Sequence, residues 1–344
     1  MRCSTLQQLP APPAGKVGWP WTEESRGYPD LMTDGTGWPR ISIVTPSYNQ
    51  GEFIEETVRS VLLQAYPNLE YIIMDGGSTD CTVEILKKYD PWITYWTSGK
   101  DGGQPQAINQ GFRRATGDII GWLNSDDVYL PGALAHVGKR WSPERRDDFW
   151  IVAGVQYRDE STGQTGVAHQ EPWYDVADWV KKEAVLHQQG SFWARAMFLA
   201  AGPLDETQQM GFDREYWIRL LASGYRFQCA GEFVAGCYRL HDKCKGKKHI
   251  LRMRYEHLLG VQRYLQMDAK TFRRELQALH KQKAYYLVRL SQDESTPRMA
   301  RVGLLLDAIR CSPVEITHRT FWGSLLRAAV PDYQMLRDRW RPVQ

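Results

Sequence analysis

The sequence has no long hydrophobic run and few cysteines, and each of these absences excludes a class of protein. No apolar stretch approaches the roughly eighteen residues that a membrane-spanning helix needs. The N-terminal segment lacks the charged start and apolar block of a secretory signal. Six cysteines in 344 residues, without paired spacing, are typical of reduced thiols rather than of a disulfide framework. We therefore expect a cytoplasmic protein, and its 42% hydrophobic residues suffice for a real core.

Apolar runs alternate with helical patterns between residues 41 and 124. Strands are predicted at 41–46, 69–75, 93–98 and 117–124, and the segments 54–65, 81–89 and 106–115 between them have helical periodicity. This alternation predicts an α/β fold with a Rossmann-like, mostly parallel sheet and helices on both faces. We predict an irregular arm at 1–40, a main domain at 41–243 and a basic, helical C-terminal region at 244–344.

Positive charge is concentrated in that C-terminal region. Twenty Lys and Arg against nine Asp and Glu give residues 245–344 a formal charge of +11, and the same count leaves −8 for residues 1–244. Two interpretations stay open: the helices lie on an anionic membrane as a peripheral contact, or their apolar stripes pack on the main domain. Nucleic acid is not an expected partner. The apolar residues concerned are Leu304, Leu305, Leu306, Trp322, Leu325 and Leu326.

Polar loops follow three of the predicted strands: PSYNQG, DGGSTD and NSDD. Ligands of open α/β sheets bind beyond the carboxyl ends of the strands. No G-x-G-x-x-G follows the first strand and no P-loop motif occurs, so phosphate must be held differently. A diphosphate near Asp126 and Asp127 would meet like charges unless a divalent cation bridges them, which predicts Mn²⁺ or Mg²⁺.

The DGGSTD loop is predicted to hold a nucleobase. Asp75 would repel a phosphate, but its carboxylate is a good acceptor for a donor such as the imide N–H of uracil, with Tyr48 flanking the ring. The glycines let the base approach the backbone.

A second candidate metal site combines Cys229, Cys237, His241 and Cys244. Their spacing fits no standard zinc knuckle, and the alternating EFVAGCY segment is typical of a strand. Structural zinc is therefore the weaker interpretation of this segment.

Four segments together closely resemble the family-two nucleotide-sugar glycosyltransferases of the GT-A fold: ISIVTPSYNQGEFIEETVRSVL, EYIIMDGGSTDCT, KDGGQPQAINQGFRRATGDIIGWLNSDD and GFDREYWIRLLASG. The resemblance covers about residues 41–241 and is closest to bacterial members that assemble surface polysaccharides. It implies an inverting reaction, in which an acceptor hydroxyl attacks the sugar as the nucleoside diphosphate leaves.

The resemblance also implies roles for individual residues. Asp126 and Asp127 match the metal-binding motif, with Asp126 also next to the donor, and Asp213 matches the catalytic base, with Glu215 as a rival. This sequence departs from the family pattern at Gly76 and Asn124, where the family often has Asp. The remaining donor contacts implied are Pro46, Tyr48, Asp75, Gly103, Gln104, Ala107 and Asn109.

Two further segments have open roles. His241 is predicted to reach the metal or phosphate from a late strand, although an ordinary loop histidine is the alternative. His187, Gln188 and Gln189 are candidates for lining the acceptor site, as the corresponding family segment does.

These features predict a metal-dependent inverting glycosyltransferase that moves a sugar from a nucleotide-sugar, expected to be a UDP-sugar, to a lipid-linked or growing surface glycan. One alternative is a sugar nucleotidyltransferase, which needs a glycine-rich loop with a basic residue after the first strand; PSYNQG provides neither. The other is a non-catalytic nucleotide- or sugar-binding module, which the acidic residues at the metal and base positions disfavour.

Overall fold

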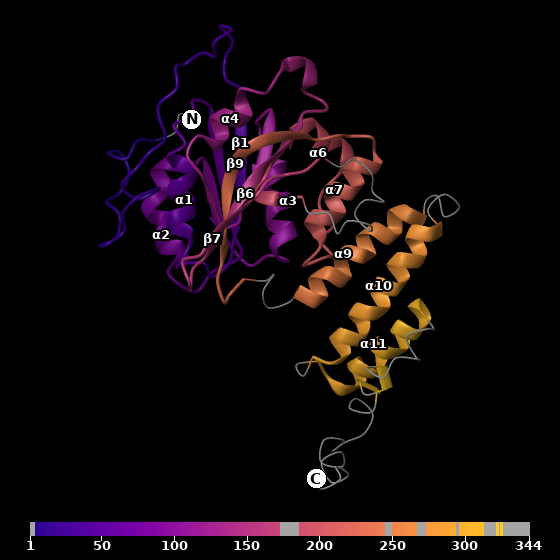
Figure 1. The fold of residues 1–344 in the computed structure, drawn as a ribbon. Helices are drawn as coiled ribbons and strands as arrows, with labels where there is room; N and C mark the ends of the chain where they lie inside the picture. The colour runs from indigo at the N-terminus through magenta and orange to yellow at the C-terminus, as the bar shows by residue number, and fades with distance from the viewer. Residues whose placement is uncertain are drawn as a thin grey trace. The chain divides into compact units, whose positions relative to one another are not determined.

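The computed structural model describes residues 4–172, 186–244, 250–266, 273–293, 296–312, 321, 322, 324 and 325. The chain divides into two compact units (Figure 1). One unit comprises Met1–Tyr174 with Val185–Cys244, and the other comprises Asp175–Ala184 with Lys245–Gln344. None of the described helices is both long and apolar enough to cross a membrane.

The first half of the larger unit is the predicted βα repeat. Its strands pair in parallel in the order β3-β2-β1-β4. Helices α1 and α2 lie on one face and α3 on the other, so β1, β2 and β4 are buried throughout (Figure 1). The elements are β1 (Ile41–Ser47), α1 (Ile54–Leu62), β2 (Leu69–Asp75), α2 (Thr82–Tyr89), β3 (Tyr95–Ser98), α3 (Gln104–Arg114) and β4 (Ile119–Trp122).

The second half makes the sheet mixed. Strand β8 is antiparallel to both β4 and β6, so β6 and β9 run in the same direction as β4. The carboxyl ends of β6 and β9 therefore point to the same edge as those of β1–β4. The elements are β5 (Val128–Tyr129), α4 (Ala133–Gly138), β6 (Trp150–Asp159), β7 (Thr165–Ala168), β8 (Ser191–Ala194), α6 (Arg195–Ala201), α7 (Phe212–Ala222) and β9 (Gln228–Leu240).

The α/β class is thus confirmed, and the parallel order holds for its first four strands. Beyond β4 the order continues as β8-β6-β9-β5, with β7 added beside β6. The antiparallel pairing of β6 with β7 suits their short connection, because adjacent parallel strands need a crossover.

A cluster of tryptophans fixes α7 to the sheet. Trp217 of α7 stacks on Trp122 of β4, with ring centroids 5.5 Å apart, and on Trp150 of β6 at 5.4 Å. It meets Trp193 of β8 edge to face at 5.0 Å. All four rings are buried. This packing holds the start of α7, and with it Asp213, in a fixed position.

The N-terminal arm is tied to the larger unit by a buried arginine. Arg59 of α1 is fully buried and donates to the carbonyl oxygens of Pro10, Pro20 and Trp21 at 2.8–3.0 Å. It also donates to the Tyr89 hydroxyl at 3.0 Å. The charged group therefore joins three backbone carbonyls of the arm to α1.

We expect Arg59→Ala to lower the free energy of unfolding by about 3 kcal/mol or more, because several buried carbonyls lose a charged donor at once. Arg146→Ala is the matched control, since the Arg146 side chain is 75% exposed, and it should change stability by less than about 0.5 kcal/mol. Denaturant unfolding measures both. Equal stability of the two variants would contradict this role for Arg59.

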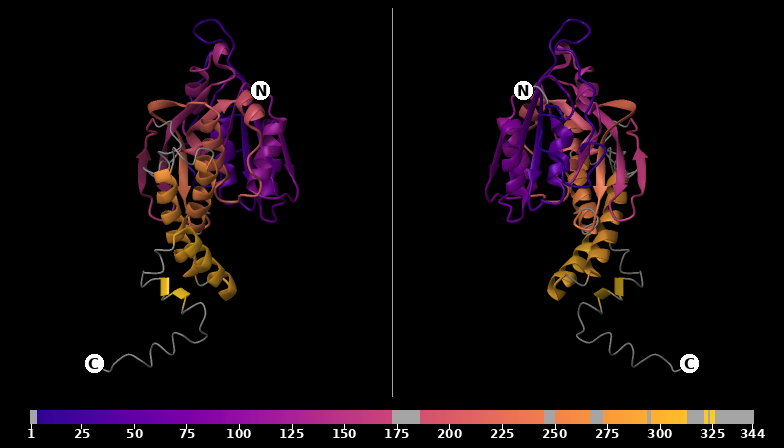
Figure 2. Two further views of the ribbon diagram at one scale, coloured as in Figure 1. Left: turned by 90° about the vertical axis from the view of Figure 1, so that its right-hand side faces the viewer. Right: turned by 90° about the vertical axis from the view of Figure 1, so that its left-hand side faces the viewer.

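The helical unit has a small core of its own. Helix α10 (Arg273–Ser291) packs beside both α9 (Ile250–Leu265) and α11 (Arg298–Cys311), and Figure 2 draws the helices of this unit in orange to yellow. Leu305 of α11 packs with Leu287 of α10 and with Phe321, and Leu304 and Leu325 pack against this cluster. Some of the apolar residues named from the sequence are therefore packed in this core, whereas Leu306 and Trp322 are exposed. Leu326 lies outside the described residues.

Candidate functional site

Four loops lie at the carboxyl edge of the parallel strands, and they contain most of the predicted site residues. The loops follow β1, β2, β3 and β4. Because these strands are parallel, all four loops begin at the same edge of the sheet. Hydrogen bonds join the loops in sequence. The Gly99 amide donates to the Asp75 carbonyl at 3.0 Å, and the Gln104 side chain donates to the Asn124 side chain at 2.9 Å.

Asp75 is buried at the end of β2 and organises the loop that follows it. Its Oδ2 accepts from the amides of Gly77 and Ser78, at 3.2 and 2.9 Å, and from the Ser98 hydroxyl at 2.6 Å. Its Oδ1 accepts from the Ser78 hydroxyl at 2.5 Å. Since a carboxylate oxygen accepts about two hydrogen bonds, Oδ1 has room for one more donor. Contact with a base N–H stays a prediction that this geometry permits.

The loop after β1 is tied to the loop after β2. The Asn49 amide donates to the Ser78 hydroxyl at 2.7 Å, and the Thr79 amide donates to the Asn49 side chain at 2.8 Å. Tyr48 is 61% exposed, so its ring is accessible to a base. Pro46 is buried within β1 beside Met74. Because Pro46 belongs to β1, its predicted contact requires the nucleotide-sugar to touch the end of the strand.

Gly103 has a backbone conformation that only glycine adopts readily. Its φ is +104° and its ψ is −178°, and its amide donates to the Asp101 side chain at 2.8 Å. It begins α3, and the Gln104 side chain reaches Asn124 from there. The loop conformation that presents Gln104 to the acidic segment therefore depends on this glycine.

We expect Gly103→Ala to cost about 1–3 kcal/mol of folding free energy, because alanine is strained at this φ and ψ. A Cβ there would also meet the Gln209 side chain at 2.6 Å, although that flexible group can move. Gly99→Ala is the control in the same loop, since a Cβ at Gly99 meets nothing within 4 Å. Denaturant unfolding of the two variants checks this, and an unperturbed Gly103→Ala protein would show that the loop tolerates a side chain.

Asn109 has a structural role that the sequence did not indicate. Its fully buried amide donates to the Leu204 carbonyl and accepts from the Leu204 amide, both at 2.9 Å, and it also donates to Glu206 at 2.9 Å. These bonds leave the side chain committed to the segment that leads to α7. Ala107 is buried as well. The predicted donor contacts of Asn109 and Ala107 have no support in this packing.

The two acidic residues after β4 have different surroundings. Asp127 is fully buried, and its carboxyl group accepts from the Gln189 side chain at 2.8 Å and from the Arg239 amide at 3.1 Å. Burial, and then the neighbouring charge of Asp126, raise the pKa of Asp127 well above its usual range. The Asp126 side chain is 21% exposed. The geometry therefore favours Asp126 as the residue that meets a ligand and Asp127 as the residue that holds the loop.

Asn124 explains how this segment tolerates its departure from the family pattern. Its amide accepts from Gln104 and donates to Gln188 at 3.2 Å and to Asp127 at 3.4 Å. An aspartate at this position would place a third carboxylate beside Asp126 and Asp127 and could not donate. The neutral amide therefore suits the position.

Asp126, His241 and Cys244 form a group whose ligand atoms all lie within 4.8 Å of one another. His241 follows β9, and its ring stacks on Phe53 with centroids 4.1 Å apart. Its Nε2 lies 3.4 Å from Asp126 Oδ2, yet neither ring nitrogen makes a hydrogen bond to any described residue. A buried imidazole without partners beside a carboxylate fits a bound cation.

Arg239 forms hydrogen bonds to Asp126 of this group and to Asp127 beside it. It is fully buried, pairs with Glu56 at 2.8 Å, and donates to the Asp126 carbonyl through its side chain and to Asp127 through its amide. Of the cysteines considered for zinc, Cys244 joins the group, whereas Cys229 and Cys237 do not. The sequence places His241 and Cys244 close together, but it gives no sign that Asp126, from a distant part of the chain, is their neighbour.

Asp213 and Glu215 both lie in the first turn of α7, with different partners. Glu215 is buried and pairs with Arg219 at 2.9 Å, which commits it to a structural contact. Asp213 Oδ1 accepts from the Arg214 amide at 2.8 Å, and burial raises the pKa of its carboxyl group. The preceding segment is joined to the first turn of α3, because the Gln106 side chain donates to Glu206 at 3.1 Å.

The segment 187–189 is hydrogen-bonded to the end of β4 and to Asp127. Gln188 donates to the Trp122 carbonyl at 2.5 Å, and Gln189 donates to Asp127. His187 lies 3.5 Å from the Tyr157 hydroxyl, and burial lowers the pKa of His187 to about 4. All three side chains are buried. An acceptor-lining role for them stays a prediction.

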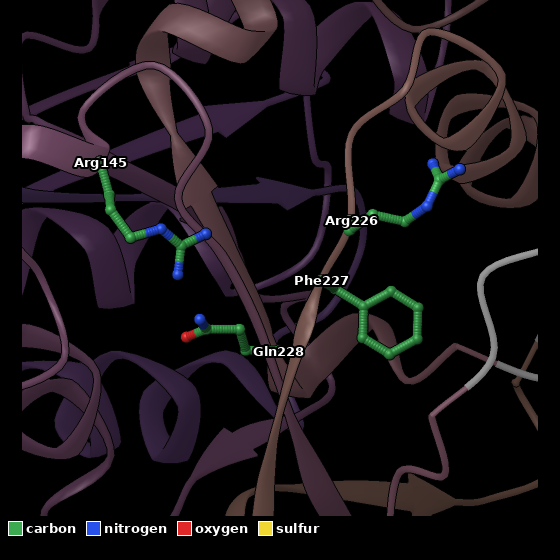
Figure 3. A pocket seen from close by; sticks show the side chains of 4 residues that line it. All are labelled: Arg145, Arg226, Phe227 and Gln228. Atoms are coloured by element: carbon green, nitrogen blue, oxygen red, sulfur yellow. The ribbon is translucent and has the colours of Figure 1, made fainter.

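A cavity of about 360 Å³ lies away from these residues (Figure 3). Arg145, Arg226, Phe227 and Gln228 line it where β9 begins, at the opposite end of that strand from His241. Arg145 and Gln228 approach each other in the figure, while Arg226 and Phe227 point away from them. Arg145 is already bonded to Asp148 at 3.2 Å. The cavity contains none of the predicted site residues.

The sequence of residues 42–199 matches the family described as glycosyl transferase family 2. These residues belong to that family. This glycosyltransferase segment contains β1 through β8 and the acidic residues, while Asp213 and His241 follow it in the same folded unit.

Known relatives of the glycosyltransferase segment include bacterial proteins. An uncharacterized glycosyltransferase of Rickettsia typhi is 26% identical over 195 residues, which are 55% of this chain and 61% of that protein. The putative teichuronic acid biosynthesis glycosyltransferase TuaG of Bacillus subtilis is 43% identical over 103 residues, or 29% of this chain and 41% of TuaG. The chain therefore spans less than two thirds of the length of either relative.

The fold of this chain is also found in a solved structure. The S. aureus TarS fragment 1–349 in complex with UDP-GlcNAc has a TM-score of 0.58 to this chain at 15% identity. The match covers 88% of this chain and 93% of the TarS fragment. This likeness confirms the GT-A fold.

Proposed function

We propose that this chain is a metal-dependent, inverting glycosyltransferase that moves a sugar from a UDP-sugar to a hydroxyl of a lipid-linked or growing surface glycan. The single observation that carries the proposal is the meeting of Asp126 with His241 at the carboxyl edge of the sheet. These residues lie 115 positions apart in the chain. An imidazole brought there without a hydrogen-bond partner among the described residues is best explained by a ligand.

The loops after β1, β2 and β3 are proposed to hold the nucleoside. Asp75 Oδ1 has room for one donor, which suits the N–H of a uracil ring, and Tyr48 is exposed one residue beyond β1. Gly103 and Gln104 would contact the donor from the start of α3. The hydrogen bonds of Asp75 within its loop hold the acceptor oxygen in place before the base arrives, which lowers the ordering cost of binding.

Asp126 and His241 are proposed to hold a divalent cation beside the diphosphate. Carboxylate and imidazole suit Mn²⁺, and diphosphate oxygens complete such a site. When bound, the ion stabilises the charge that develops on the leaving diphosphate. Asp127 keeps the loop in place through Gln189 and Arg239 rather than contacting the ion.

Asp213 is proposed to accept the proton of the attacking acceptor hydroxyl. It lies at the start of α7, where the helix dipole favours a negative charge, and the tryptophan packing of α7 fixes its position. Glu215 is less suited, because Arg219 neutralises it. Attack on the face of the sugar opposite the leaving group inverts the configuration at that carbon.

A surface-glycan acceptor fits the chemistry of the helical unit. TuaG, which matches part of the chain, is named for teichuronic acid biosynthesis. The helical unit is basic and exposes Met299, Leu306 and Trp322, at 83%, 49% and 52%. Basic and apolar side chains together favour an anionic membrane surface. We propose a peripheral position on the cytoplasmic face of the membrane, where a lipid-linked acceptor is within reach.

The proposal is tested with a panel of nucleotide-sugars and Mn²⁺. Calorimetry measures binding, and donor hydrolysis or transfer measures turnover. We expect a UDP-sugar to bind and turn over only with the metal. No binding of any donor at any metal concentration refutes the proposal, while binding without turnover indicates a non-catalytic module.

A further inference from the structure

We infer that Cys244 is a third protein ligand of the divalent cation, so that the site prefers ions that accept sulfur over Mg²⁺. The inference rests on the proposed function only in assuming that the bound ion takes part in catalysis. The binding site itself consists of Asp126, His241 and Cys244, whose ligand atoms all lie within 4.8 Å of one another. Ligand atoms in a bound site are about 3–4 Å apart, so small side-chain rotations are enough.

A tight turn after β9 places the sulfur next to the imidazole. The Cys244 amide donates to the His241 carbonyl at 3.1 Å, and the His241 amide donates to Cys244 Sγ at 3.3 Å. The first and last residues of this turn are therefore the two ligands.

The surroundings of Cys244 are polar, although the residue is buried. Its sulfur also lies 3.1 Å from the Arg239 carbonyl, and Asp126 lies across from it. A buried cysteine that serves only as a small hydrophobic group packs among apolar side chains. His241 has no hydrogen-bond partner among the described residues at either ring nitrogen, which is a second sign of a missing ligand.

A thiolate changes which ions the site selects. Sulfur is a soft ligand and favours Co²⁺ and Zn²⁺, whereas Mg²⁺ prefers oxygen ligands only. Asp126 and His241 alone would discriminate weakly. With Cys244 included, binding of the ion releases the thiol proton to solvent, and the chain prefers transition metals.

Cobalt titration of the free, full-length protein tests the inference without relying on activity. We expect one equivalent of Co²⁺ to produce a sulfur-to-cobalt charge-transfer band in the near ultraviolet. Cys244→Ser should lose that band, still bind Co²⁺, and reduce the preference for Co²⁺ over Mg²⁺ at least tenfold. Cys229→Ser is the matched control, since Cys229 lies at the start of β9, away from the group, and it should keep the band.

The outcomes separate this inference from the proposed function. Cobalt bound by the wild-type protein without a charge-transfer band overturns the inference and leaves Asp126 and His241 as ligands. No cobalt binding overturns it as well. A band that persists in Cys244→Ser assigns the sulfur to another cysteine and also overturns it. Because the wild-type band needs no variant, misfolding of Cys244→Ser does not affect the test. A band in a protein that binds no nucleotide-sugar supports the inference while the proposed function fails.

Discussion

Asp213→Asn is expected to abolish sugar transfer while leaving donor binding unchanged. A positioned general base contributes about 10²–10⁴-fold to the rate, and an amide cannot take the hydroxyl proton. Asparagine is isosteric and keeps an oxygen for the Arg214 amide, so α7 should keep its packing on Trp122. Transfer assays at saturating donor, together with calorimetry of UDP binding, measure the two effects separately.

Glu215→Gln is the matched control for this prediction. Its pairing with Arg219 is structural, so the variant should lose stability while the rate constant of the folded enzyme changes little. Transfer that survives in Asp213→Asn and disappears in Glu215→Gln would reverse the assignment. If both variants transfer normally, the base lies elsewhere.

We also expect the rate of sugar transfer to depend on pH through Asp213. Burial raises the pKa of Asp213 above its usual value. The base must be ionised to act, so kcat/KM should rise with pH through the raised pKa and fall as pH decreases below it. We expect the acid limb above about pH 4, the usual pKa of aspartate, in a pH–rate profile. An acid limb at or below that value would indicate that another group controls the rate.

Loss of the proposed metal ligands should have an effect of similar size. Asp126→Asn and His241→Ala each remove one proposed ligand. Even losing an outer partner of a ligand costs about 10–100-fold, so metal affinity should fall by more than that and transfer should approach background. Chelation of the wild-type protein should give the same loss, and added Mn²⁺ should restore it. Manganese binding and metal-dependent transfer are the measurements.

His280→Ala is the control, because His280 belongs to α10 of the helical unit. Asp127→Asn separates the two acidic residues. We expect it to lower the free energy of unfolding, through its bonds to Gln189 and Arg239, more than it lowers metal affinity. If Asp127→Asn instead loses the metal while Asp126→Asn binds it normally, the roles of the two carboxylates are exchanged.

Local patterns predicted the first half of the fold. The segment LEYIIMD forms β2 at the predicted bounds, and ISIVTP forms β1 with one added residue. Both strands are buried on two faces, so each is a mostly apolar run that can be read from adjacent residues. The α/β class and the crossover order follow from the alternation of such runs with helices.

Contacts between distant segments could not be predicted in the same way. Asn109 lies in a helix with an ordinary pattern, and nothing nearby reveals that its amide holds Leu204. The different environments of Asp126 and Asp127 depend on Gln189 and Arg239, which come from later parts of the chain. The sequence could therefore propose which residues gather at this edge of the sheet, whereas the different surroundings of neighbouring residues required the three-dimensional arrangement.

The position of β9 limits how the protein can be dissected. The match to the family ends at residue 199, but β9 lies between β6 and β5 in the middle of one half of the sheet. A fragment cut at residues 42 and 199 would have two unpaired edges and would leave Arg59 without the carbonyls of the arm. Such a fragment should aggregate instead of folding autonomously, because the cooperative unit is larger than the segment that the family match covers.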